Sequence, residues 1–193
     1  MNVYVETNFV LELALLQEQN ESCTALVQLA EANRIQLIMP AYALAEPYET
    51  LTRRHRQRQR MRTELDAELR QLARTVTYAE RLSGFQHLTT VLLESADEET
   101  TRLERVCTQL LQVAEIVPLT ATLLAAAMQH QHTSELSAQD ALVYAAVLEH
   151  LQQASTAQSC FLNRNSKDFD DPDLVAELQR YHCKLLPQFD AGH

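Results

Sequence analysis

The sequence predicts a three-layer α/β/α fold in which helices cover both faces of a central parallel sheet, with an additional helical insertion. Short buried apolar runs alternate with longer segments of helical periodicity, which is the pattern of parallel α/β proteins. Only two glycines and five prolines occur in 193 residues that are 46% hydrophobic, which argues against disorder and against a turn-rich β protein. A chain of this length is most naturally one domain, 1–193.

The first ten residues, MNVYVETNFV, predict a buried strand that runs directly into a helix. Glu6 ends the apolar run, and Thr7 and Asn8 are helix-capping residue types. An acid at the carboxyl end of a leading parallel strand lies where open α/β sheets build their sites. The alternative for Glu6 is a favourable interaction with the helix N-terminus.

A helix over 23–33 and an apolar strand over 35–39 follow, and Pro40 closes the strand. Residues 41–51 predict the next helix, which carries Glu46. Pro47 falls inside this pattern and should bend the helix, because it lacks the N–H of an ordinary residue and its ring crowds the preceding turn.

The segment 53–62 contains six of the sixteen basic residues and no acid, although the net charge of the chain is −10. On a helix its arginines form two stripes: Arg53, Arg56 and Arg60, and Arg54, Arg58 and Arg62. A solvated helix surface is the alternative to nucleic-acid binding, but such surfaces usually mix charge signs. The basic stripe therefore favours contact with nucleic acid.

Residues 53–113 predict a helical excursion between two strands, longer than an ordinary crossover. It is compatible with an arm, a lid or a dimerisation surface. Strands at 116–119 and 160–163 and an edge strand at 184–186 complete the sheet, and helices are expected over 121–128, 136–148 and 174–181.

Asp140 lies in the first turn of the helix that Ser137 caps, among small residues that should let this helix pack closely on the sheet. An acid in a first helical turn is also a common structural choice. Together with Glu6, Glu46 and the polar loop 163–171, it places acids and amides at strand ends and helix starts. All-oxygen ligands of this kind suit Mg²⁺ or Mn²⁺, which would activate water for displacement at phosphorus.

The four cysteines show no CxxC pair, which argues against a zinc site or a disulfide framework. No apolar stretch has the length that a membrane helix needs, and the amino terminus reads as a strand instead of a signal peptide. We therefore expect a cytoplasmic protein that does not associate with membranes.

Four segments, in this order, resemble the PIN-domain family: VYVETNFVLE, PAYALAEPYETL, LSAQDALVYAAVLEH and FLNRNSKDFDDPDL. The resemblance covers nearly the whole chain outside 53–113. It implies a three-layer α/β/α fold and metal-dependent cleavage of RNA, often by the toxin of a toxin–antitoxin pair. Homodimers and an antitoxin or other protein partner are implied as well.

Carried over position by position, the resemblance makes Glu6, Glu46 and Asp140 the ligands of Mg²⁺ or Mn²⁺. Asp168 would be a further catalytic acid, and Asn8 and Asn165 would orient water or phosphate.

The family usually has aspartate at the position of Glu6, and often has it at the position of Asn165. These departures, together with the arginine-rich tract, favour an alternative function, a PIN-fold module that binds RNA or a protein without catalysis.

Overall fold

The structure is a computed structural model that describes residues 1–79, 82, 85–134, 136–154, 158–164, 169 and 171–190. Within these residues the sheet is parallel and has five strands. The strand order is β3-β2-β1-β4-β5. The strands are β1 (Asn2–Val5), β2 (Gln36–Pro40), β3 (Glu115–Val117), β4 (Ser159–Leu162) and β5 (Cys183–Leu186). Every strand expected from the sequence is present, within one or two residues of its expected ends.

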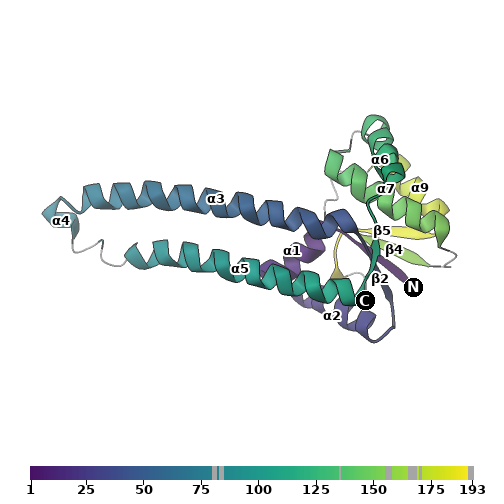
Figure 1. The fold of residues 1–193 in the computed structure, drawn as a ribbon, viewed down its shortest axis with the longest axis horizontal. Coiled ribbons are helices and arrows are strands. Elements are labelled where there is room, and N and C mark those ends of the chain that lie inside the picture. The colour runs from purple at the N-terminus through teal and green to yellow at the C-terminus, as the bar shows by residue number, and fades with distance from the viewer. Residues whose placement is uncertain are drawn as a thin grey trace.

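Helices cover both faces of this sheet, which confirms the predicted three-layer fold (Figure 1). One layer contains α1 (Thr7–Leu15), α2 (Asn20–Glu31), α3 (Ala41–Leu72) and α5 (Phe85–Val113). The other contains α6 (Ala121–Thr133), α7 (Ala138–Gln153) and α9 (Pro172–Arg180). Alternation along β1 separates the two cores: Val3 and Val5 belong to the first and Tyr4 to the second.

Between β2 and β3, helices α3 and α5 lie side by side and point away from the sheet as a long arm, with α4 (Val76–Ala79) at its far end (Figure 1). The helix expected over 41–51 and the arginine-rich tract belong to one continuous helix, α3. Pro47 does not interrupt it. Pro47 is buried, so packing of its ring helps to offset the backbone hydrogen bond that a proline removes.

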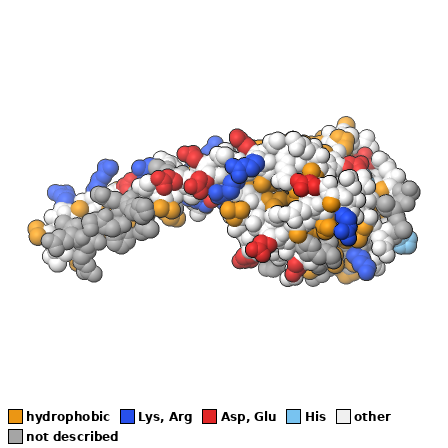
Figure 2. All heavy atoms as spheres, turned by 90° about the horizontal axis from the view of Figure 1, so that it is seen from below, with side chains coloured by type: hydrophobic (Ala, Val, Ile, Leu, Met, Phe, Trp, Pro, Cys, Tyr) orange, Lys and Arg blue, Asp and Glu red, His pale blue; other side chains and the backbone are white. Residues whose placement is uncertain are grey.

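Acidic and basic side chains are interspersed along the face of the arm that Figure 2 shows. Across the arm, Arg58 of α3 forms a bidentate ion pair with Glu99 of α5, in which both N–O distances are 2.9 Å. The residue Glu99 is only 8% exposed. This ion pair therefore holds the two long helices together near the middle of each.

All four cysteines are buried and free. Among the helices described here, none is long and apolar enough to cross a membrane.

The order of the strands determines where a site can form. The chain builds outward from β1 to β2 and β3, then crosses to β4 on the other side of β1. The strand order thus reverses between β1 and β4, and in open α/β sheets ligands bind outside the carboxyl ends of the strands at such a point. Glu6 follows β1 there, and Asn163 follows β4.

Candidate active site

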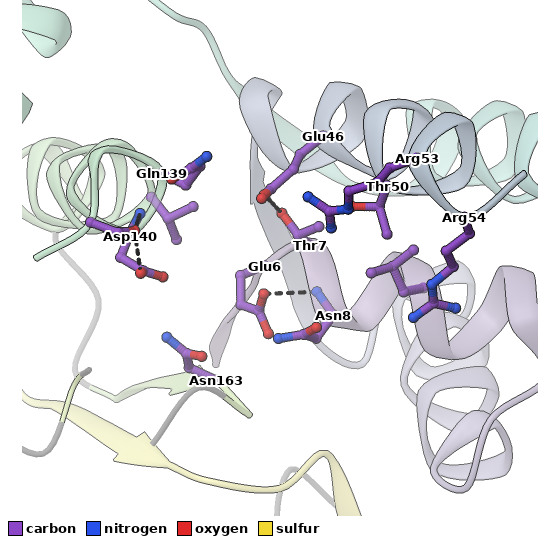
Figure 3. Close-up of a pocket in the computed structure, with 13 residues that line it drawn as sticks. Glu6, Thr7, Asn8, Glu46, Thr50, Arg53, Arg54, Gln139, Asp140 and Asn163 are labelled. Carbon is purple, nitrogen blue, oxygen red and sulfur yellow. Dashed lines mark hydrogen bonds between the residues drawn. The ribbon is translucent and has the colours of Figure 1, made fainter. Parts of the chain in front are cut away.

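Glu6 and Asn163 lie beside each other at the carboxyl edge of the sheet, because Val5 and Leu162, the residues before them, are register partners. Both side chains line a cavity of about 420 Å³ (Figure 3). Helices α1, α3 and α7 supply most of the rest of its wall. The other lining residues are Thr7, Asn8, Leu11, Glu46, Thr50, Arg53, Arg54, Ser137, Gln139, Asp140 and Val143.

The two carboxylate oxygens of Glu6 have different surroundings. Glu6 is the N-cap of α1, and its Oε2 accepts a hydrogen bond of 2.7 Å from the backbone N–H of Asn8. Its Oε1 is buried and has no hydrogen-bond partner among the described residues. The helix-capping interpretation of Glu6 therefore applies to Oε2, and Oε1 takes no part in the cap. Glu6 itself, and not Thr7 or Asn8, is the capping residue.

Burial raises the pKa of Glu6 from 4.5 to about 7. The backbone and side-chain N–H groups of Asn8 and the backbone N–H of Arg164 favour the ionised form and act in the opposite direction, and the carboxylate of Glu46 adds a small repulsion. A carboxyl group that is only 6% exposed is costly to ionise without a cation or a full set of hydrogen bonds. This position therefore favours either a bound proton or a bound positive charge.

Glu46 projects from the second turn of α3 toward the carboxyl edge, where its Oε2 accepts a hydrogen bond from the hydroxyl of Thr7 (Figure 3). Thr7 is the first residue of α1 and is 7% exposed. The hydroxyl therefore orients one oxygen of a half-buried carboxylate that shares the cavity with Glu6. Such supporting bonds commonly hold metal-ligating carboxylates in place.

Asp140 enters the cavity from the first turn of α7, which Ser137 caps as expected. The Ser137 hydroxyl accepts from the backbone N–H of Asp140 at 3.1 Å and donates to its Oδ2 at 2.5 Å. This arrangement resembles a capping box, with aspartate in place of the usual glutamate or glutamine. Asp140 thus stabilises its helix and also lines the cavity, so a structural role and a role in the site are compatible.

The structure brings Glu6, Glu46, Asp140 and Asn8 to one cavity, as the sequence suggests. Asn165 and Asp168 lie outside the described residues. The sequence also gave no reason to place Arg53 at this cavity, but α3 carries Arg53 and Arg54 past its mouth (Figure 3). Thr50, one turn after Glu46, and Gln139, beside Asp140, also line it without having been anticipated.

The arginine tract divides into residues with different roles. Arg58 is bound to Glu99, and Arg62 lies 3.6 Å from Asp66. Arg53, Arg56 and Arg60 are exposed and, together with residues including Tyr48 and Thr52, line a groove of about 940 Å³. The acids that partner this tract lie after it on α3 and on α5, so the tract alone did not reveal them.

An unanticipated ion pair joins α1 to the residue that follows Asn163. Glu12 of α1 is 1% exposed and accepts hydrogen bonds from the guanidinium of Arg164 and, at 2.8 Å, from the backbone N–H of Gln19. Arg164 directly follows Asn163, which lines the cavity. The ion pair therefore ties the segment after β4 to α1, and apolar periodicity gave no reason to expect a buried acid at position 12.

The donor set at the cavity suits a hard divalent cation. Within the described part of the chain, no three His, Cys, Asp or Glu side chains are close enough together to enclose a metal ion. Mg²⁺, however, keeps several waters and is usually held by one or two carboxylates together with substrate phosphates. The unpartnered Oε1 of Glu6, with Glu46 and Asp140 at the same cavity, fits that mode of binding.

A family model described as a PIN domain matches residues 3–169. This range includes all the residues that line the cavity and both helices of the arm. Neither a curated protein nor a solved structure matches the chain. PIN domains have a nuclease fold and generally use divalent metal ions. Since the match covers most of the chain, the chain belongs to the PIN-domain family.

Proposed function

We propose that this protein is an endoribonuclease that depends on Mg²⁺ or Mn²⁺ and hydrolyses phosphodiester bonds in RNA. The observation that carries the proposal is Oε1 of Glu6. This oxygen is buried without a hydrogen-bond partner among the described residues, at the strand-order reversal, in a cavity shared with two more acids. Burying an unsatisfied carboxylate oxygen is costly, and a functional site explains why the fold tolerates it.

Glu6, Glu46 and Asp140 would hold the ion. When bound, it would lower the pKa of a water molecule and neutralise charge that develops on the phosphate oxygens. The hydroxyls of Thr7 and Ser137 fix the carboxylates of Glu46 and Asp140 in place. This preorganisation matters because small displacements of catalytic groups reduce rates severely.

Amide and guanidinium groups at the same cavity would handle the substrate. The side chains of Asn8 and Asn163 can donate to a water molecule or a phosphate oxygen, and both line the cavity. Arg53 and Arg54 add positive charge at its mouth, where a phosphodiester would enter. The site therefore combines a negatively charged interior for a cation with a positively charged entrance for the substrate.

The test is incubation of the purified protein with a mixture of labelled single-stranded RNAs in Mn²⁺, in Mg²⁺ and in excess chelator. We expect cleavage that chelator abolishes and that Glu6→Gln abolishes. The matched control is Glu21→Gln, which removes the same charge from an exposed position on α2 outside the cavity and should cleave like the parent. No chelator-sensitive cleavage by the parent would overturn the proposal.

A binding module without catalysis is the second candidate function. Two observations favour it: the glutamate at position 6, and the lack of three closely grouped metal-binding side chains within the described residues. Calorimetric titration with Mn²⁺ separates the two candidates. Affinity in the millimolar range or tighter that Glu6→Gln removes supports the nuclease, and its absence supports the module.

A toxin role is a narrower form of the nuclease proposal and adds a protein partner. An antitoxin would have to cover the cavity or its entrance in order to inhibit cleavage. A small reading frame beside the gene whose product suppresses the chelator-sensitive cleavage would support this form. A neighbouring product that leaves cleavage unchanged would not.

A further inference from the structure

The outward face of the arm carries an arginine stripe that is not used for folding. Arg58 points across the arm to Glu99 and also donates to Ser95 at 3.1 Å. In contrast, Arg53, Arg56 and Arg60 are exposed, and the described residues include no acid within ion-pair distance of them. Three unpaired guanidiniums in a row repel one another, so a structural role does not explain them.

These three arginines line a groove of about 940 Å³ together with neutral polar side chains, Glu49 and one aromatic residue, Tyr48, which is 42% exposed. Guanidinium groups bind phosphate oxygens, and an exposed aromatic ring offers a surface on which a base can stack. A row of arginines beside such a ring is the combination by which proteins bind single-stranded nucleic acid without reading its sequence.

The groove adjoins the candidate active site at Arg53. Arg53 lines both the groove and the acidic cavity, so positive charge extends from the arm to the entrance of the cavity. From Arg53 to Arg60 the helix rises about 10 Å, at roughly 1.5 Å per residue. The groove can therefore contact more than one nucleotide of a strand.

The charge of the whole chain gives this stripe an orienting role. The net charge is −10, and the segment 53–62 carries six arginines and no acid, so the rest of the chain repels a polyanion. A localised basic surface on an acidic protein directs an approaching nucleic acid to one place. Here that place is the arm beside the cavity.

We propose that Arg53, Arg56, Arg60 and Tyr48 bind single-stranded RNA that flanks the phosphate to be cleaved, so that the arm guides one side of the strand into the cavity. This inference rests on the proposed ribonuclease function and extends it to the substrate. A cavity of about 420 Å³ has the size of a small-ligand pocket and favours a single strand over a duplex.

The test measures the affinity of the full chain for a fluorescein-labelled 20-nucleotide single-stranded RNA in chelator, from 50 to 200 mM salt. Three phosphate contacts contribute about 2 to the slope of log affinity against log salt for a single strand. The slope of the triple variant Arg53→Gln, Arg56→Gln, Arg60→Gln should therefore be shallower than that of the parent by about 2. Its affinity deficit relative to the parent should shrink by about 20-fold between the two salt concentrations.

Two further variants control for charge and for side-chain identity. Arg34→Gln with Arg74→Gln and Arg180→Gln removes three exposed arginines from elsewhere and should keep the slope of the parent. Replacing the three groove arginines by lysine should also largely restore the slope, because the charges remain.

An unchanged slope in the glutamine triple variant, or an equal loss in the control triple variant, would overturn the inference. Equally tight binding of duplex RNA through the same three arginines would overturn its single-strand part. RNA binding with the expected slope but without chelator-sensitive cleavage would contradict the proposed ribonuclease activity and support the RNA-binding groove. Chelator-sensitive cleavage without measurable RNA binding by the groove would support the activity and contradict the groove.

Discussion

Glu6→Gln should make the metal-free protein more stable at pH 8 while it abolishes cleavage. The reason is that Glu6 is buried and its Oε1 lacks a hydrogen-bond partner among the described residues, so its negative charge is poorly compensated unless a cation is bound. Residues kept for function at the expense of stability are common in active sites. The neutral amide keeps an oxygen with which to accept the hydrogen bond from the Asn8 N–H.

The magnitude follows from the pKa of Glu6, which burial raises from 4.5 to about 7. Each pKa unit corresponds to about 1.4 kcal/mol, so the ionised carboxylate destabilises the folded chain by about 3 kcal/mol. Below pH 4.5 the group is protonated in both states and no penalty applies. As the pH rises from 4.5 to 7 the unfolded chain ionises first, so the free energy of unfolding falls, and above pH 7 the penalty is constant.

The assay is urea unfolding of parent and variant in chelator at pH 5, 6, 7 and 8. The advantage of Glu6→Gln over the parent should grow by about 2–3 kcal/mol across this range and level off above pH 7. Any packing cost of the amide applies at every pH and cancels from the change. Glu64→Gln, at an exposed position on the arm, should show no such pH-dependent gain.

A stability difference that stays constant from pH 5 to pH 8 would refute this reasoning. It would mean that Glu6 ionises in the folded chain as easily as in water, and hence that water or a partner already satisfies its Oε1. The cavity would then lack the unsatisfied oxygen on which the metal proposal depends.

Three more predictions concern the surroundings of the site. Thr7→Val should keep the fold but lower Mn²⁺ affinity or cleavage by about 10- to 100-fold, because Glu46 loses the hydroxyl that orients it; Thr7→Ser should restore most of the loss in the same assays. Arg164→Gln should lower the free energy of unfolding by up to about 3 kcal/mol in urea, since it leaves the buried carboxylate of Glu12 without its counter-charge; Arg164→Lys should lose less. Adding Mn²⁺ at one hundred times its Kd should stabilise the parent by about 2.7 kcal/mol and leave the midpoint of Glu6→Gln unchanged in thermal unfolding.

The sheet and the main site residues could be predicted from the sequence because their signals are local. Each strand is a short apolar run, and Glu6 directly follows the first of them. Parallel strands place their carboxyl ends at one edge, so acids that follow different strands meet there without any knowledge of packing. Asp140 is brought to the same edge by the helix that Ser137 caps, and the sequence already marked that cap.

The partners of the arginine tract could not be predicted, because they depend on how two long helices pack. Arg58 and Glu99 are 41 positions apart and meet only because α5 returns alongside α3. Helical periodicity indicated the two stripes of arginines but not which stripe would face the other helix.

The effect of Pro47 also depends on tertiary packing. The residue type predicts a bend, and α3 continues through Pro47 without a break. Pro47 is buried, and the packing of its ring helps the helix to continue.

The buried ion pair between Glu12 and Arg164 could not be predicted from the sequence either. A glutamate on an amphipathic helix is expected on the solvated face, yet Glu12 is 1% exposed because Arg164, 152 positions later, supplies its counter-charge. Tertiary contacts decide such cases.

A crystal structure of the protein soaked in Mn²⁺ tests the central claim most directly, because it examines metal occupancy and the convergence of the acids together. Anomalous scattering should reveal Mn²⁺ bound to Oε1 of Glu6, with Glu46 and Asp140 as direct or water-mediated ligands, and Glu6→Gln crystals soaked in the same way should lack it. A cavity without Mn²⁺ at a concentration that supports cleavage, or an ion bound elsewhere on the chain, would contradict the proposed site.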